Sequence, residues 1–142
     1  VSTMVLFGAL TGPIHFNWRL FLSGRQRQEL EATGRITIPI GIGFRKTLVV
    51  EEEVIKEVER IDAHQLFGTI ACPLLIVHGN ADPIEKMFLK NTRQAMAYLP
   101  PGSKVAVIDG ASHGFCRHID LLTDLSSSWL RERLSVERIG AR

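Results

Sequence analysis

The chain has 142 residues, of which 45% are hydrophobic and 23% are charged, and its formal net charge is +2. These values are ordinary for a globular protein of single-domain size. Lys and Arg are scattered without a basic stripe or interleaved aromatic residues, which argues against a nucleic-acid partner. No apolar run approaches the roughly 20 residues that span a bilayer, so we expect a soluble protein with no membrane partner.

Cysteine and histidine are too sparse to indicate a disulfide scaffold or a metal site. Cys72 and Cys116 should lie at opposite ends of neighbouring strands, beyond the reach of a disulfide, so we predict two free thiols and a cytoplasmic location. His113 and His118 are five residues apart, which misses the i, i+4 spacing of a helical metal pair. We therefore expect neither a metal nor another cofactor.

The first predicted strand lies within residues 1–11. Val1 to Gly8 is a short apolar run rich in β-forming residues, and Gly12-Pro13 marks the loop that follows it. The run begins without a turn or a helix cap, so we expect the chain to be a segment of a longer protein.

Residues 12–64 have weaker patterns and are expected to form a small insertion. The spacing of apolar residues predicts a helix over residues 16–27, an irregular hairpin over 35–48 and a short helix over 51–60. The aromatic residues of the first helix are expected to pack in a core, with a pocket lining as the alternative: Phe16, Trp18 and Phe21.

Residues 65–142 alternate between predicted strands (74–77 and 105–108) and helices (85–99 and 119–134). This alternation predicts right-handed βαβ units on a parallel sheet, with Phe115 and Trp129 in its core. Such sheets carry their chemistry beyond the carboxyl ends of the strands. Here the loops 78–83 and 110–115 occupy that position.

The two loops contain a carboxylate and an imidazole that could work together. Asp82 and His113 follow neighbouring parallel strands, which lie about 4.8 Å apart, so both side chains should meet at one edge of the sheet. A catalytic triad needs such an acid to hold the histidine in the right tautomer, so that the histidine can take a proton from a nucleophile.

Simpler interpretations of the same residues stay open. Asp82 could only cap the helix that begins near Pro83, and His113 could be an ordinary loop histidine. His78 is expected to be a packed, hydrogen-bonded histidine. Asp109 is a second candidate for the acid, ranked below Asp82 because little chain separates it from His113.

Two stretches, Ile70 to Pro83 and Val107 to Phe115, together with a closing helix that carries Trp129-Leu130, resemble the C-terminal part of an α/β-hydrolase. The resemblance implies that Asp82 is the triad acid and His113 the triad histidine. Gly34 to Asp62 is similar to the small cap of serine-aminopeptidase-like and cinnamoyl-esterase-like members. The implied fold is a partial α/β-hydrolase fold of about three parallel strands with flanking helices and a small cap insertion.

The acid loop departs from the family's pattern. Pro83-Ile84-Glu85-Lys86 stands where the family commonly has small and β-branched residues with a proline. This departure affects the expected shape of the loop.

The family's chain order also bears on Gly110-Ala111-Ser112-His113-Gly114, which matches the G-x-S-x-G nucleophile elbow of serine hydrolases. The nucleophile precedes the acid and the histidine in that order, and only one helix follows Ser112, so we interpret the match as a coincidence. The resemblance then implies a segment of a serine hydrolase that acts on small carboxylic esters through an acyl-enzyme. The nucleophile and the oxyanion hole would lie outside this chain, and the chain alone should be inactive.

The alternative function is a non-catalytic or associating α/β domain. Its first strand, residues 1–7, would leave an exposed sheet edge that pairs with a second copy or with a complementing N-terminal half.

Overall fold

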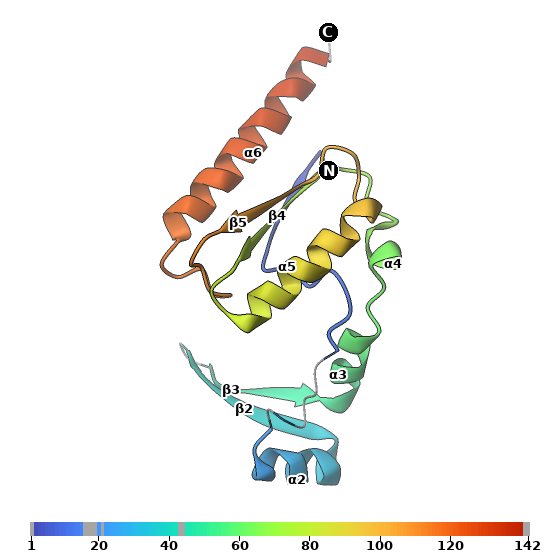
Figure 1. Ribbon diagram of the computed structural model, residues 1–142, viewed down its shortest axis with the longest axis vertical. Helices are drawn as coiled ribbons and strands as arrows, with labels where there is room; N and C mark the ends of the chain where they lie inside the picture. Colours follow the sequence, from blue (N-terminus) through green and yellow to red (C-terminus); the bar gives the residue numbers. More distant parts are fainter. Residues whose placement is uncertain (1, 16–19, 21, 43–44, 141–142) are drawn as a thin grey trace. The chain divides into compact units, whose positions relative to one another are not determined.

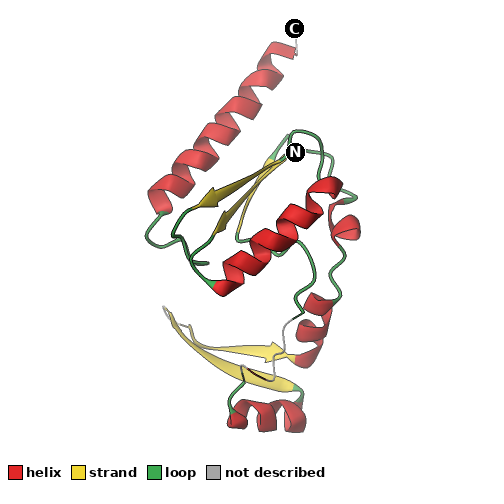
Figure 2. Cartoon of the chain, viewed as in Figure 1, coloured by secondary structure: helices red, strands yellow, loops and turns green. Residues whose placement is uncertain are grey.

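The computed structural model describes residues 2–15, 20, 22–42 and 45–140 (Figure 1). The chain divides into two compact units: Val1–Gly12 with Asp62–Arg142, called here the sheet unit, and Pro13–Ile61, called the hairpin unit. Figure 2 distinguishes the helices and strands of both units.

The sheet unit is built on three parallel strands, as the sequence predicts. β1 (Met4–Phe7), β4 (Leu74–Gly79) and β5 (Lys104–Ile108) lie in the order β1-β4-β5. Met4 pairs with Leu74 on one side of β4, and Leu75 pairs with Lys104 on the other. Every residue of the central strand β4 is buried, which explains its continuous apolar sequence.

Helices cover both faces of this sheet. α5 (Pro83–Ala95), its 3-10 extension η1 (Met96–Tyr98) and the short α4 (Ala63–Phe67) belong to one face, and α6 (Ile119–Gly140) covers the other (Figure 1). Successive residues of a strand point to opposite faces. The two resulting cores are therefore Leu74, Ile76, Phe67, Ala95 and Leu99 on the α5 face, and Leu75, Val77, Ile108, Ala111, Phe115 and Trp129 on the α6 face.

Phe115 and Trp129 are buried in the core, which confirms the prediction for both. The indole Nε1 of Trp129 donates a hydrogen bond to Thr3 Oγ1 at 2.7 Å, and Thr3 Oγ1 donates to the carbonyl oxygen of Pro73 at 2.8 Å. This pair of bonds joins α6 to the beginnings of β1 and β4.

The hairpin unit contains α2 (Gly24–Thr33), β2 (Arg35–Ile42), β3 (Arg45–Glu51) and α3 (Glu52–Glu59). α2 begins with a capping box between Ser23 and Gln26 and ends at Gly34, whose φ of 68° requires the left-handed region that glycine tolerates. β2 and β3 pair antiparallel with a register shift between Pro39 and Ile42, so the predicted irregular hairpin is confirmed.

Two predictions about the chain differ from the structure or lie beyond it. The helix predicted over residues 16–27 is interrupted, because Ser23 has the extended backbone of an N-cap and α2 begins after it, over Gly24–Thr33. Phe16, Trp18 and Phe21 lie outside the described residues.

Cys72 and Cys116 are both free thiols, as predicted. None of the helices within the described ranges is long and apolar enough to cross a bilayer.

Candidate active site

The loops after β4 and β5 lie side by side at the carboxyl edge of the parallel sheet. The side chain of Asn80 donates to Asp109 Oδ1 and accepts from the backbone N–H of Gly110, both at 2.8 Å. The backbone N–H of Ala81 donates to the carbonyl oxygen of Ala111 at 2.9 Å. These bonds bring together the loop that carries Asp82 (residues 78–83, the acid loop) and the loop that carries His113 (residues 110–115, the histidine loop), as the strand order predicts.

Gly79 makes this approach possible because it has no side chain. A Cβ atom there would collide with the carbonyl oxygen of Ala111. The end of β4 therefore requires glycine for a steric reason.

Asp82 lies next to His113, but it contacts the backbone and not the imidazole. Asp82 caps α5, because its Oδ1 accepts from the backbone N–H of Glu85 at 2.9 Å. Its Oδ2 accepts from the backbone N–H of His113 at 2.7 Å. The N–H of Glu85 is the main cause that lowers the pKa of Asp82, and the N–H of His113 adds to the effect. The expected contact between the Asp82 carboxylate and the His113 ring is absent from the hydrogen bonds of the described residues, in which both Asp82 oxygens accept from backbone N–H groups.

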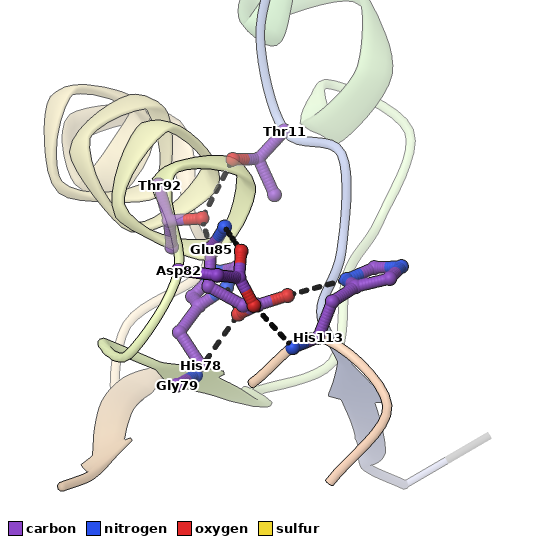
Figure 3. Close-up of polar contacts among 7 residues, drawn as sticks. All are labelled: Thr11, His78, Gly79, Asp82, Glu85, Thr92 and His113. Atoms are coloured by element: carbon purple, nitrogen blue, oxygen red, sulfur yellow. Dashed lines mark hydrogen bonds and ion pairs between the residues drawn. The ribbon is translucent and has the colours of Figure 1, made fainter. Parts of the chain in front are cut away.

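The ring of His113 is held by a different carboxylate. Its Nδ1 lies 2.5 Å from Glu85 Oε1 (Figure 3), and its ring makes a T-shaped contact with the ring of Phe88, with 5.5 Å between the two centroids. The His113 side chain is 54% exposed. Among the described residues nothing forms a hydrogen bond with its Nε2, so this nitrogen is open to a reactant.

Glu85 is fully buried and is the site residue that sequence reasoning missed. An acid three residues after an N-cap residue is ordinarily a member of a capping box, and Glu85 stands at that distance from Asp82. The available signal was its place on α5, where Glu85, Phe88, Leu89 and Thr92 share one buried face at helical spacing. An acid on that face must have partners inside the protein.

His78 is a packed and hydrogen-bonded histidine, as predicted. Its Nδ1 lies 3.1 Å from Glu85 Oε2 and its Nε2 lies 2.7 Å from Thr92 Oγ1. Thr92 Oγ1 is in turn 2.7 Å from Thr11 Oγ1 (Figure 3). Burial lowers the pKa of His78 and outweighs the opposing effect of Glu85, which favours the neutral ring.

Two other residues were considered from the sequence, Ser112 as a chance match to a nucleophile elbow and Asp109 as a second candidate for the acid. Ser112 is exposed on the loop between β5 and α6, and the helix begins only at Ile119, so the sharp strand-to-helix turn of a nucleophile elbow is not formed around it. The Asp109 carboxylate accepts a hydrogen bond from the side chain of Asn80. The part of the chain that the structure describes has no group of three or more His, Cys, Asp and Glu that could hold a metal ion.

An imidazole with Nδ1 on a carboxylate and Nε2 open is arranged for proton transfer. In such a pair the carboxylate keeps the proton on Nδ1 and stabilises the imidazolium that forms when Nε2 takes a proton. His113 with Glu85 has this arrangement, at the edge of the sheet where α/β folds place their ligands.

Comparisons with known proteins support the fold. No family model and no curated protein matches the sequence. The structure is similar to the esterase domain of a Rhodothermus marinus protein, with a TM-score of 0.58 and 17% identity over 93% of this chain. It is also similar to a protein of Agrobacterium vitis S4 that is provisionally named a hydrolase, with a TM-score of 0.60 and 19% identity over 94% of this chain.

The chain spans about half the length of each of these structures, 52% of the first and 49% of the second. The predicted fold class, a partial α/β-hydrolase fold with three parallel strands and flanking helices, is confirmed by the topology and by this similarity.

Proposed function

We propose that this chain carries the acid-base part of a serine-hydrolase site, which cleaves small carboxylic esters through an acyl-enzyme. The observation that carries the proposal is His113, whose Nδ1 lies on a carboxylate while its Nε2 is open to a reactant. His113 would first take the proton of an attacking hydroxyl and then return it to the leaving group. Asp82 would hold the histidine loop in place through the backbone N–H of His113.

The attacking serine and the oxyanion hole would come from outside this chain. Two features support this part of the proposal: the chain spans about half of the structures it resembles, and Ser112 lacks an elbow. Because the members of a triad act as a unit, a histidine and an acid without their nucleophile should give no turnover.

Labelling with a fluorophosphonate tests the proposal. The 142-residue chain alone should be unlabelled and should release no p-nitrophenol from a short-chain ester. The longest natural product that contains this sequence should be labelled, and His113→Ala should lower its ester hydrolysis by about 10³-fold or more. His118→Ala is the matched control. Labelling of the short chain at Ser112, or unchanged hydrolysis in His113→Ala, would overturn the proposal.

A second candidate function is association without catalysis, and the edge of the sheet favours it. Among the described strands, β1 pairs only with β4 and so has one free side, and its last residue Phe7 is 46% exposed. Free edges of such sheets recruit further strands. Light scattering should then show dimers, and a strict monomer across micromolar concentrations would contradict this candidate.

A further inference from the structure

Glu85 is a buried carboxylate whose two oxygens contact three hydrogen-bond donors among the described residues. Its Oε2 accepts from the backbone N–H of Gly79 at 2.9 Å and faces His78 Nδ1, and its Oε1 faces His113 Nδ1. The residue has no exposed surface. A buried carboxylate is stable in its charged form only when such donors compensate for the lost water.

The partners of His78 fix where its proton lies. A neutral ring has one N–H, and the ionised carboxylate of Glu85 can only accept, so Nδ1 of His78 carries the proton. Nε2 then accepts from the hydroxyl of Thr92, and Thr92 accepts from the hydroxyl of Thr11. With the protons placed in this way, every donor in the hydrogen-bonded series Thr11, Thr92, His78 and Glu85 has an acceptor.

The same reasoning applies to His113. Glu85 Oε1 accepts the proton of His113 Nδ1, which leaves the lone pair on Nε2. Asp82 does not have this effect in the structure, because its hydrogen bonds are to the backbone N–H groups of Glu85 and His113 and not to the ring of His113.

Gly8 adds an independent steric argument. At the end of β1, with a φ of 52°, it faces the contact between the two site residues. A Cβ atom there would lie 2.9 Å from Glu85 Oε1 and 3.0 Å from His113 Nδ1. Glycine is therefore required here both by the positive φ and by the close approach of Glu85 and His113.

We infer that Glu85 is the positioning residue that fixes His113 in the Nδ1–H tautomer, that His78 with Thr92 and Thr11 fixes Glu85, and that Asp82 only anchors the loop. The catalytic meaning of this inference rests on the proposed function. The tautomer itself can be measured without turnover, so failure of the labelling experiment and failure of this inference are distinguishable.

The test is NMR spectroscopy of the full chain with 15N-labelled histidine, at a pH where the rings are neutral. In the wild type, the ring of His113 should carry its proton on Nδ1. Asp82→Asn keeps a good helix cap and should leave this tautomer unchanged while it shifts the backbone N–H signal of His113. Glu85→Gln should reduce the Nδ1–H form of His113 from nearly the whole population to a minority.

Glu132→Gln, which makes the same change at an exposed position of α6, is the matched control and should alter neither histidine. If Glu85→Gln does not fold, Asp82→Asn and the wild type still decide the question. An Nε2–H tautomer in the wild type, or loss of the Nδ1–H form in Asp82→Asn, overturns the inference.

Discussion

The two units use glutamate in opposite ways. In the hairpin unit, Glu52 and Glu53 of α3 form ion pairs with Lys56 and Arg60, and these side chains are between 43% and 72% exposed. In the sheet unit, Glu85 meets His78 and His113 with no exposed surface. Water screens the exposed pairs and leaves them little net energy, whereas the buried carboxylate of Glu85 must find its hydrogen-bond partners within the protein.

This difference separates two purposes of charge. Exposed pairs can be lost with little effect because water replaces each partner. A buried carboxylate with three donors is costly to leave incomplete, and it fixes the groups around it in one arrangement. The following experiments compare the two units on this basis.

Glu85→Ala should have the largest effect. It leaves the N–H of Gly79 and the Nδ1–H of His78 without an acceptor; each such buried group costs about 1 to 3 kcal/mol, so the free energy of unfolding should fall by about 2 to 6 kcal/mol. Denaturant unfolding followed by circular dichroism measures this. A loss below 1 kcal/mol would show that water reaches the site and that burial does not govern Glu85.

Thr92→Val should have an intermediate effect. The change keeps the shape of the side chain but removes the hydroxyl that serves His78 Nε2 and Thr11, and it should cost about 1 to 3 kcal/mol. Thr123→Val, at an exposed position of α6, is the control and should be nearly neutral. Equal effects of the two changes would contradict the network.

The stability of the sheet unit should depend on pH through His78. Burial lowers the pKa of His78 in the folded chain, so between that pKa and about 6.5 the unfolded chain binds the proton. This contribution to stability is therefore complete above pH 6.5 and is lost as the pH falls below it, by at most about 1.4 kcal/mol per pH unit. Urea unfolding of the wild type from pH 8 to pH 5 should show the decline, and His118→Gln should retain it. Stability that rises as the pH falls through this range would contradict the neutral ring.

Glu53→Gln in the hairpin unit should have the smallest effect. It removes an exposed partner of Lys56 and Arg60, and the free energy of unfolding should change by less than about 0.5 kcal/mol. The same unfolding measurement checks this, and 0.5 M salt should erase what remains. A change above 1 kcal/mol would show that these exposed ion pairs stabilise the fold as strongly as the buried hydrogen bonds of Glu85.

Much of the sheet unit was predictable because its strands are continuous apolar runs and its helices have clear ends. Leu74 to Val77 indicates a strand covered on both faces, and Asp82 before Pro83 indicates the start of α5. The hairpin unit was less clear, since the polar sequence of α2 has no apolar face to indicate its bounds and its helix depends on the caps at Ser23 and Gly34.

The site was predictable to the level of which loops meet, but not of which atoms touch. Strand order places Asp82 beside His113, and a hydrogen bond between them is present. The choice between the backbone and the ring of His113 depends on angles within a few residues of the loop, which periodicity does not determine. Glu85 was missed because an acid three residues into a helix is normally an exposed capping residue.

The hydrogen bond from the Gly79 backbone to Glu85 makes this amide a sensor of the site. Its neighbours in β4 exchange their protons with deuterated solvent at rates that the sheet controls. The rate at Gly79 depends instead on a side-chain acceptor, so removal of that acceptor in Glu85→Ala should speed deuterium uptake at Gly79 more than at its neighbours in β4.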